Sequence, residues 1–303
     1  MNKRILFPVL SVFSLVLFFY LGQNYYLSIS RPGGQGGARQ RAWEQMRHKI
    51  ESEISRFKGD AGVIIKDLGT GREFSYNGRK LFASASMVKI PIMGSCFLAA
   101  RENKLDLGES SLLKVSDKTS GSGTLKRIRP GTSFSNEELI GLMIYESDNT
   151  AANMLIDMLG EEYLNDSFRR FGLKDTNISR RIADFASRDK GVENYTSAQD
   201  IACMLELIYE GKLVDKQASD ESLIFLKLQR VNDRIPRYLP KKTIVAHKTG
   251  LERSVCHDAG IVFTDKGDFL VTVLTGHSNS TSRPSKRFIA RVALRVYEYS
   301  RQL

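Results

Sequence analysis

The chain has 303 residues, of which 42% are hydrophobic and 26% charged, so it is long and apolar enough for one large globular domain or two interleaved ones. Its net charge is +11, from 45 Lys and Arg against 34 Asp and Glu. The basic residues are scattered, and the densest cluster, residues 126–129, has no interleaved aromatic side chains. We therefore expect a solvated basic surface and no nucleic-acid partner.

The cysteines and histidines give no sign of a metal site. Cys96, Cys203 and Cys256 lie far apart without a CxxC spacing, and the histidines form no HExxH pattern. We expect free thiols, no disulfide framework, and no bound metal or cofactor.

Residues 1–30 are expected to be a targeting segment. Lys3 and Arg4 precede an apolar run from Ile5 to Gly22, which as a helix spans roughly 27 Å, nearly the thickness of a bilayer core. The positive residues predict that the N-terminus stays inside and that the body lies outside the cytoplasm. We expect an uncleaved single-pass anchor in the cell membrane. The alternative is a cleaved signal peptide and a secreted product.

The next segments predict a linker, a helix and a hairpin. Residues 31–39 are rich in glycine and predict a flexible linker. Residues 40–57 have a helical spacing of apolar residues. Residues 61–68 and a strand beginning at 74–76 flank a Gly-Thr-Gly turn, which predicts two antiparallel strands.

The stretch around Ser86 predicts a buried helix and a chemical site. Ser84 is expected to cap this helix, and Pro91 is expected to bend it just past the site. Ser86 and Lys89 stand three residues apart and so share one helical face. A lysine amine with a depressed pKa can take the proton of a serine hydroxyl, and a helix N-terminus favours an oxyanion. The pair therefore indicates a nucleophile and its base.

The middle of the chain is mostly helical, interrupted by irregular stretches at residues 116–132 and 176–196. The expected helices cover residues 136–145, 150–159, 161–171, 198–209 and 219–228.

Strands return near the C-terminus. Residues 243–247, 259–264 and 269–275 predict strands, the last two joined by a turn at 265–267, and residues 287–299 predict an amphipathic helix. Strands at both ends around a helical middle predict an α+β fold in which one antiparallel sheet receives a helical insertion. The expected domain at 40–303 has a sheet part, about 40–80 and 230–303, and a helical part, about 81–229.

Three short motifs now stand in order, each with a chemical use: Ser86-x-x-Lys89, Ser147-Asp148-Asn149 and Lys248-Thr249-Gly250. The Ser147 hydroxyl can relay a proton to a leaving amine, and the Asn149 amide can hold a substrate amide and a lysine. Lys248 can neutralise a substrate carboxylate, with Thr249 hydrogen-bonding it. Gly250 leaves room for an extended substrate beside its strand.

With these motifs the sequence resembles the class A β-lactamases and penicillin-binding proteins, from about residue 42 to the C-terminus. The resemblance implies a β-lactamase/transpeptidase-like three-layer sandwich, with a five-stranded antiparallel sheet flanked by helices and an all-helical domain. It implies that Ser86 is the nucleophile and Lys89 its base partner. It also implies an oxyanion hole made by the backbone N–H groups of Ser86 and Leu251.

The sequence departs from the β-lactamase pattern at the loop that should carry a Glu-x-x-x-Asn element. No glutamate in residues 180–194 has an asparagine four positions on, and Glu193 lies too close to the following helix. Asp184 is the nearest carboxylate and the possible deacylation residue, but Arg188 stands where the asparagine would be. The alternative role for Asp184 is to accept loop-stabilising hydrogen bonds.

These observations together predict an extracytoplasmic serine hydrolase facing the cell wall. It would form an acyl-enzyme at Ser86 with β-lactams or with peptidoglycan stems ending in D-Ala-D-Ala, and deacylation of the β-lactam adduct would be slow. The alternatives are a penicillin-binding D,D-carboxypeptidase and a non-hydrolytic β-lactam sensor. The short cytoplasmic tail that the anchor implies argues against signalling by this chain alone.

Overall fold

The computed structural model describes residues 34–278 and 281–303. Its centre is a five-stranded antiparallel sheet in the order β2-β1-β9-β8-β7. The strands are β1 (Asp60–Asp67), β2 (Glu73–Tyr76), β7 (Val245–Glu252), β8 (Val255–Thr264) and β9 (Gly267–Gly276). Both ends of the chain contribute strands to this sheet, which confirms the predicted α+β class with helices inserted between the strands.

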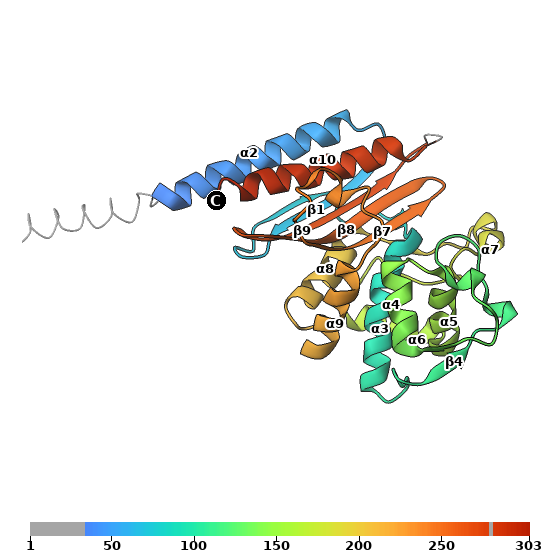
Figure 1. The fold of residues 1–303 in the computed structure, drawn as a ribbon. Helices are drawn as coiled ribbons and strands as arrows, with labels where there is room; N and C mark the ends of the chain where they lie inside the picture. Colours follow the sequence, from blue (N-terminus) through green and yellow to red (C-terminus); the bar gives the residue numbers. More distant parts are fainter. Residues whose placement is uncertain (1–33, 279–280) are drawn as a thin grey trace, which may run out of the picture.

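Helices α2 (Gly34–Arg56) and α10 (Arg283–Ser300) lie side by side over one face of the sheet (Figure 1). Trp43 and Ile50 of α2 lie two turns apart and are buried. Trp43 meets the ring of Tyr299 edge to face, with the ring centroids 5.5 Å apart. Burying one such side chain contributes roughly 1.5–3 kcal/mol relative to leaving it exposed, so this packing holds the outer layer in place.

Helix α2 begins at Gly34, which corrects the predicted boundary between a linker at residues 31–39 and a helix from residue 40. The Arg39 guanidinium donates to Asp67 Oδ2 at 2.8 Å, and the Tyr299 hydroxyl lies 3.2 Å from the same oxygen. These long-range contacts stabilise helical geometry in a glycine-rich segment that by local propensity alone favours a coil.

The helical part covers the other face of the sheet (Figure 1). Its α-helices are α3 (Lys89–Arg101), α4 (Asn136–Tyr145), α5 (Asn149–Leu159), α6 (Glu161–Arg170), α7 (Phe185–Asp189), α8 (Ala198–Tyr209) and α9 (Lys216–Lys227). Short 3-10 turns are η1 (Ala85–Val88), η2 (Val115–Asp117), η3 (Leu125–Arg127) and, near α10, η4 (Ile235–Tyr238). Two-stranded sheets pair β3 (Phe82–Ala83) with β6 (Tyr195–Thr196) and β4 (Ser110–Leu112) with β5 (Ser133–Ser135).

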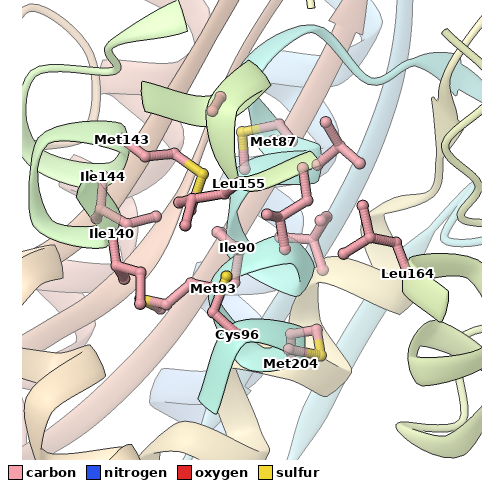
Figure 2. Packing of buried hydrophobic residues seen from close by; sticks show 14 of the residues in the cluster. Met87, Ile90, Met93, Cys96, Ile140, Met143, Ile144, Leu155, Leu164 and Met204 are labelled. Atoms are coloured by element: carbon pink, nitrogen blue, oxygen red, sulfur yellow. The ribbon is translucent and has the colours of Figure 1, made fainter. Parts of the chain in front are cut away.

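The interior of the helical part is an apolar cluster that supports the turn η1 (Figure 2). Met87 of η1 and Ile90 of α3 pack in this cluster together with Met143 of α4 and Leu155 of α5. Helix α8 contacts both the sheet and α3, and it contributes Met204. Close packing of this kind restrains the backbone around Ser86.

The chain at Ser86 begins as a 3-10 turn and becomes an α-helix only at Lys89. The expectation that Ser84 caps the helix is therefore wrong, and the bend expected at Pro91 stays a prediction. Ser84 makes no side-chain cap hydrogen bond, because its own backbone is already in the helical region at φ −67° and ψ −23°. Pro91 falls in the first turn of α3, where its missing N–H removes no helical hydrogen bond, so it does not have to bend the helix.

No helix within residues 34–278 and 281–303 is long and apolar enough to cross a membrane. The predicted anchor at residues 1–30 lies outside this part of the chain, so it stays a prediction. The three cysteines are free thiols. The described side chains form no cluster of His, Cys, Asp or Glu suited to a metal ion.

Candidate active site

Ser86 lies in the turn η1, on the wall of a cavity of about 340 Å³. The preceding residue, Ala85, has a φ of +46°, a left-handed conformation that is costly for a residue with a Cβ. Residues 180–194 form a loop that contains α7 and is called the α7 loop below. The backbone N–H of Ser84 donates to the carbonyl oxygen of Asn194 at 2.7 Å, which connects the turn to the end of this loop. The surrounding contacts thus maintain a strained turn that presents Ser86 to the cavity.

Lys89 is fully buried at the start of α3. Its Nζ donates to the Ser147 carbonyl oxygen and to Asn149 Oδ1, both at 2.7 Å, and lies 3.3 Å from Ser147 Oγ. Burial lowers the pKa of Lys89 to about 7, although the charges of Asp148 and Glu252 act in the opposite direction. Near pH 7 a substantial fraction of this amine is neutral, which is the state that a general base requires.

Lys248 reaches the same hydroxyl from strand β7. Its Nζ donates to Ser147 Oγ at 2.9 Å and to the carbonyl oxygen of Thr249 at 2.8 Å. Burial, and then the positive charges of Lys89 and Arg234, hold the pKa of Lys248 well below its usual value. The Ser147 hydroxyl therefore sits between two amines that repel each other when both are charged, an arrangement suited to passing a proton.

Asp148 and Asn149 fix the start of α5 against the preceding loop. Asp148 caps the helix, because its carboxylate accepts from the N–H of Ala151 at 3.0 Å and from the N–H of Leu125 at 2.8 Å. Asn149 Nδ2 donates to the Ser120 carbonyl oxygen at 2.8 Å, while Oδ1 accepts from the lysine of α3. This orients the amide, and its second N–H hydrogen remains for a substrate carbonyl.

Strand β7 forms an edge of the sheet, since it pairs with β8 alone. Gly250 packs so closely on η1 that a Cβ there would lie 3.2 Å from Met87 Cγ. Leu251, the second predicted oxyanion residue, is 47% exposed and lines the cavity. An open strand edge at the cavity can pair with the backbone of an extended substrate.

Residues 45–300 match the family model described as the β-lactamase enzyme family. This chain belongs to that family. It is 25% identical over 270 residues to the extended-spectrum β-lactamase PER-1 of Pseudomonas aeruginosa, covering 84% of this chain and 87% of that protein. The fold, the three motifs and this match together make the protein a serine β-lactamase-like hydrolase.

Solved structures of the same superfamily superpose on most of the chain. A β-lactamase from Sphaerobacter thermophilus shares 28% identity with a TM-score of 0.78, covering 86% of this chain and 98% of that one. The protein PBP-A shares 29% identity with a TM-score of 0.78, covering 86% of this chain and 97% of that one. A variant of PBP-A was solved as an acyl-enzyme complex with penicillin G.

This β-lactamase-like chain departs from the family pattern at the α7 loop. Asp184 caps α7, accepting from the N–H of Ser187 at 3.0 Å and from its hydroxyl at 2.6 Å, and these bonds lower the pKa of the Asp184 carboxyl. Its neighbours Ile182, Ala183 and Phe185 line the cavity. The structure therefore gathers the three motifs around Ser147 and shows Asp184 accepting hydrogen bonds within its own loop, while a role of Asp184 in deacylation stays a prediction.

Sequence reasoning missed two charged residues near the motifs. Arg234 is almost fully buried, 3.0 Å from Asp233 Oδ1, and its charge acts on Lys248. No local sequence pattern identifies Arg234 as a residue near the site. Glu252 lines the cavity with Ser86. The two-residue period of a strand could have identified Glu252, because residues 248, 250 and 252 of β7 share one face.

His257 of β8 supports the nucleophile turn. It is fully buried, with Nε2 at 2.9 Å from the Ala83 carbonyl oxygen and Nδ1 at 3.1 Å from the backbone N of Thr275. A neutral ring that donates from Nε2 and accepts at Nδ1 satisfies both contacts. Burial lowers the pKa of His257 to about 4 and outweighs the opposing effect of the bond to Ala83.

This histidine predicts a pH-dependent loss of stability. An unfolded chain takes up a proton as the pH falls below 6.5, whereas folded His257 stays neutral down to about 4. Stability is therefore full above pH 6.5 and falls by about 3 kcal/mol as the pH drops toward 4. His257→Gln keeps a donor and an acceptor without titrating, so its unfolding free energy in urea should decline less over this range. Parallel declines would show that another group is responsible.

Proposed function

We propose that this β-lactamase-like hydrolase forms an acyl-enzyme at Ser86 with β-lactams or with peptides ending in D-Ala-D-Ala, and that the β-lactam adduct is hydrolysed slowly. The observation that carries the proposal is the Ser147 hydroxyl, held between Lys89 at 3.3 Å and Lys248 at 2.9 Å. Both substrate classes place a carboxylate near an amide. The Ser86 nucleophile, the buried Lys248 amine, which a carboxylate can charge, and the fixed Asn149 side chain match that combination.

The proposed steps follow from the protonation states of the two amines. Ser86 attacks the carbonyl carbon while neutral Lys89 accepts the hydroxyl proton, and the N–H groups of Ser86 and Leu251 stabilise the oxyanion. Ser147 passes the proton to the leaving nitrogen. A substrate carboxylate raises the pKa of Lys248 and so favours its charged form. Before the attack, that charge keeps Lys89 in the neutral state that a base requires.

The second candidate is a D,D-carboxypeptidase acting on peptidoglycan stems. One observation favours it: the α7 loop contributes apolar Ile182 and Phe185 to the cavity, while Asp184 caps the helix. A binding protein that remains acylated is the limiting case, in which hydrolysis of the adduct does not occur.

Parallel assays on one preparation of the protein test the proposal. Opening of a chromogenic cephalosporin and release of D-alanine from an acylated D-Ala-D-Ala peptide should both depend on Ser86. Release of D-alanine with a stable β-lactam adduct would favour the carboxypeptidase. Absence of both reactions and of any adduct would contradict the proposal.

We also propose that residues 1–30 anchor the protein in the cell membrane with the catalytic part outside the cytoplasm. Helix α2 begins at the opposite end of the molecule from α7, whose Phe185 lines the cavity, so the cavity lies far from the point where an anchor would join (Figure 1). Cell fractionation should find the protein in the membrane fraction. A soluble product whose mature N-terminus lies near Arg31 would show instead that the segment is a cleaved signal peptide.

A further inference from the structure

The cavity beside Ser86 has a carboxylate that comes from the sheet and not from the α7 loop. Its charged lining residues are Arg188, Glu252 and Arg253, and Glu252 alone among the lining residues is acidic. A carboxylate in this position matters chemically, because the ester on an acylated serine is cleared by a water molecule that must lose a proton.

Glu252 projects from the face of β7 that meets the nucleophile turn. Side chains two apart on a strand share a face, and Lys248 reaches Ser147 from that face while Gly250 packs against Met87. The Glu252 charge also acts on Lys89, whose pKa it raises. Glu252 therefore lies within electrostatic reach of the reacting groups.

The contacts between Glu252 and its two arginines are long, one on each carboxylate oxygen. Arg180 forms its short bonds with Glu193 Oε1, at 3.0 Å from Nε and 2.6 Å from Nη2, and lies 3.6 Å from Glu252 Oε1. Arg188 lies 3.6 Å from Glu252 Oε2. A carboxylate has about four acceptor sites, so one long contact on each oxygen leaves acceptor capacity for a water molecule. Burial, aided by the charge of Glu193, raises the pKa of Glu252 against the effect of both arginines, which makes it a stronger base than an exposed glutamate.

We propose that Glu252 is the general base that activates the hydrolytic water on the Ser86 acyl-enzyme. This inference rests on the proposed function. Water oxygen attacks the acyl carbonyl carbon, and one water proton passes to the Glu252 carboxylate. The tetrahedral intermediate then expels Ser86 Oγ, which takes the proton back, and the acid product leaves. Glu252 thus supplies from β7 the carboxylate that the α7 loop does not deliver.

Glu252→Gln is the direct test, because it removes the base and keeps the size of the side chain. After acylation with penicillin G and removal of free antibiotic, loss of the adduct is followed by intact-protein mass spectrometry. We expect stoichiometric acylation and a deacylation rate about 10²-fold lower than in the wild type. Wild-type deacylation should also slow as the pH falls through the Glu252 pKa, a dependence that the variant should lack.

The matched control is Glu193→Gln, which disturbs the same ion-pair network while keeping the cavity carboxylate. It should deacylate within a few-fold of the wild type and keep an acid limb, displaced to lower pH because the Glu193 charge no longer raises the Glu252 pKa. Normal deacylation of acylated Glu252→Gln would overturn the inference, whereas a wild type that never forms an adduct would overturn the proposed function. If Glu252→Gln does not fold, Glu252→Asp takes its place: a shortened carboxylate should slow deacylation and retain the acid limb, and an unchanged rate would overturn the inference.

Discussion

Replacing Ser86 with alanine is expected to abolish covalent labelling of the protein by a fluorescent penicillin. The hydroxyl oxygen is the only atom of that side chain able to form the ester, so the loss of labelling should be complete. Labelled wild-type protein is digested, and the adduct is located by peptide mass. An adduct on another residue, or undiminished labelling of Ser86→Ala, would contradict the assignment.

Ser84→Ala is the matched control for this experiment. Ser84 stands two residues away in the same turn and is buried, and its hydroxyl lies 3.4 Å from the neighbouring Ala85 carbonyl oxygen. It should be labelled like the wild type. A comparable loss in both variants would show that the turn had collapsed and that neither serine was tested as a nucleophile.

Lys89→Met should slow acylation by ~10²–10⁴-fold, the usual contribution of a general base. Methionine fills the buried space without an amine. In the wild type, the acylation rate should rise with pH through about 7, because deprotonation of Lys89 produces the active base. Stopped-flow labelling across this range measures both effects. A rate that is flat with pH, or equal in Lys89→Met, would assign the base role elsewhere.

Hydrolysis of a chromogenic cephalosporin is expected to begin with a burst of about one product per protein, followed by slow turnover. In the proposed mechanism, Lys89 is the base for acylation and Ser147 is the proton relay, whereas the α7 loop lacks the glutamate of the Glu-x-x-x-Asn element. Without a well-placed general base, the deacylation rate should fall by ~10²–10⁴-fold, which raises the barrier by about 3–5 kcal/mol. Glu252, held near two arginines, is expected to supply the remaining assistance.

Asp184→Asn separates the two candidate carboxylates in the same assay. Its carboxylate caps α7, so the variant should weaken the loop while the burst and the slow phase stay close to those of the wild type. Fast multiple turnover without a burst, reduced strongly by Asp184→Asn, would refute slow deacylation. It would identify a working β-lactamase with an aspartate base.

Local chemistry in the sequence accounts for part of this fold and part of its site. Neighbouring residues encode the turn at 265–266 between β8 and β9, the amphipathic spacing in α10 and the order of the three motifs. These features place the chain in an α+β serine hydrolase family. They also make Ser86 and Lys89 neighbours, because three residues of helical backbone bring them to one face.

The chemistry of the site depends on contacts between distant parts of the chain. The two amines that meet Ser147 stand 58 and 101 residues from it in the chain, and the low pKa of Lys89 comes from burial, which no local pattern encodes. The 3-10 turn at Ser86 and the helical start of α2 likewise depend on long-range contacts that override local propensity. For Glu252, the strand period places its side chain on the face of Lys248 and Gly250, whereas the packing of β7 against η1 brings that face to the cavity that Ser86 lines.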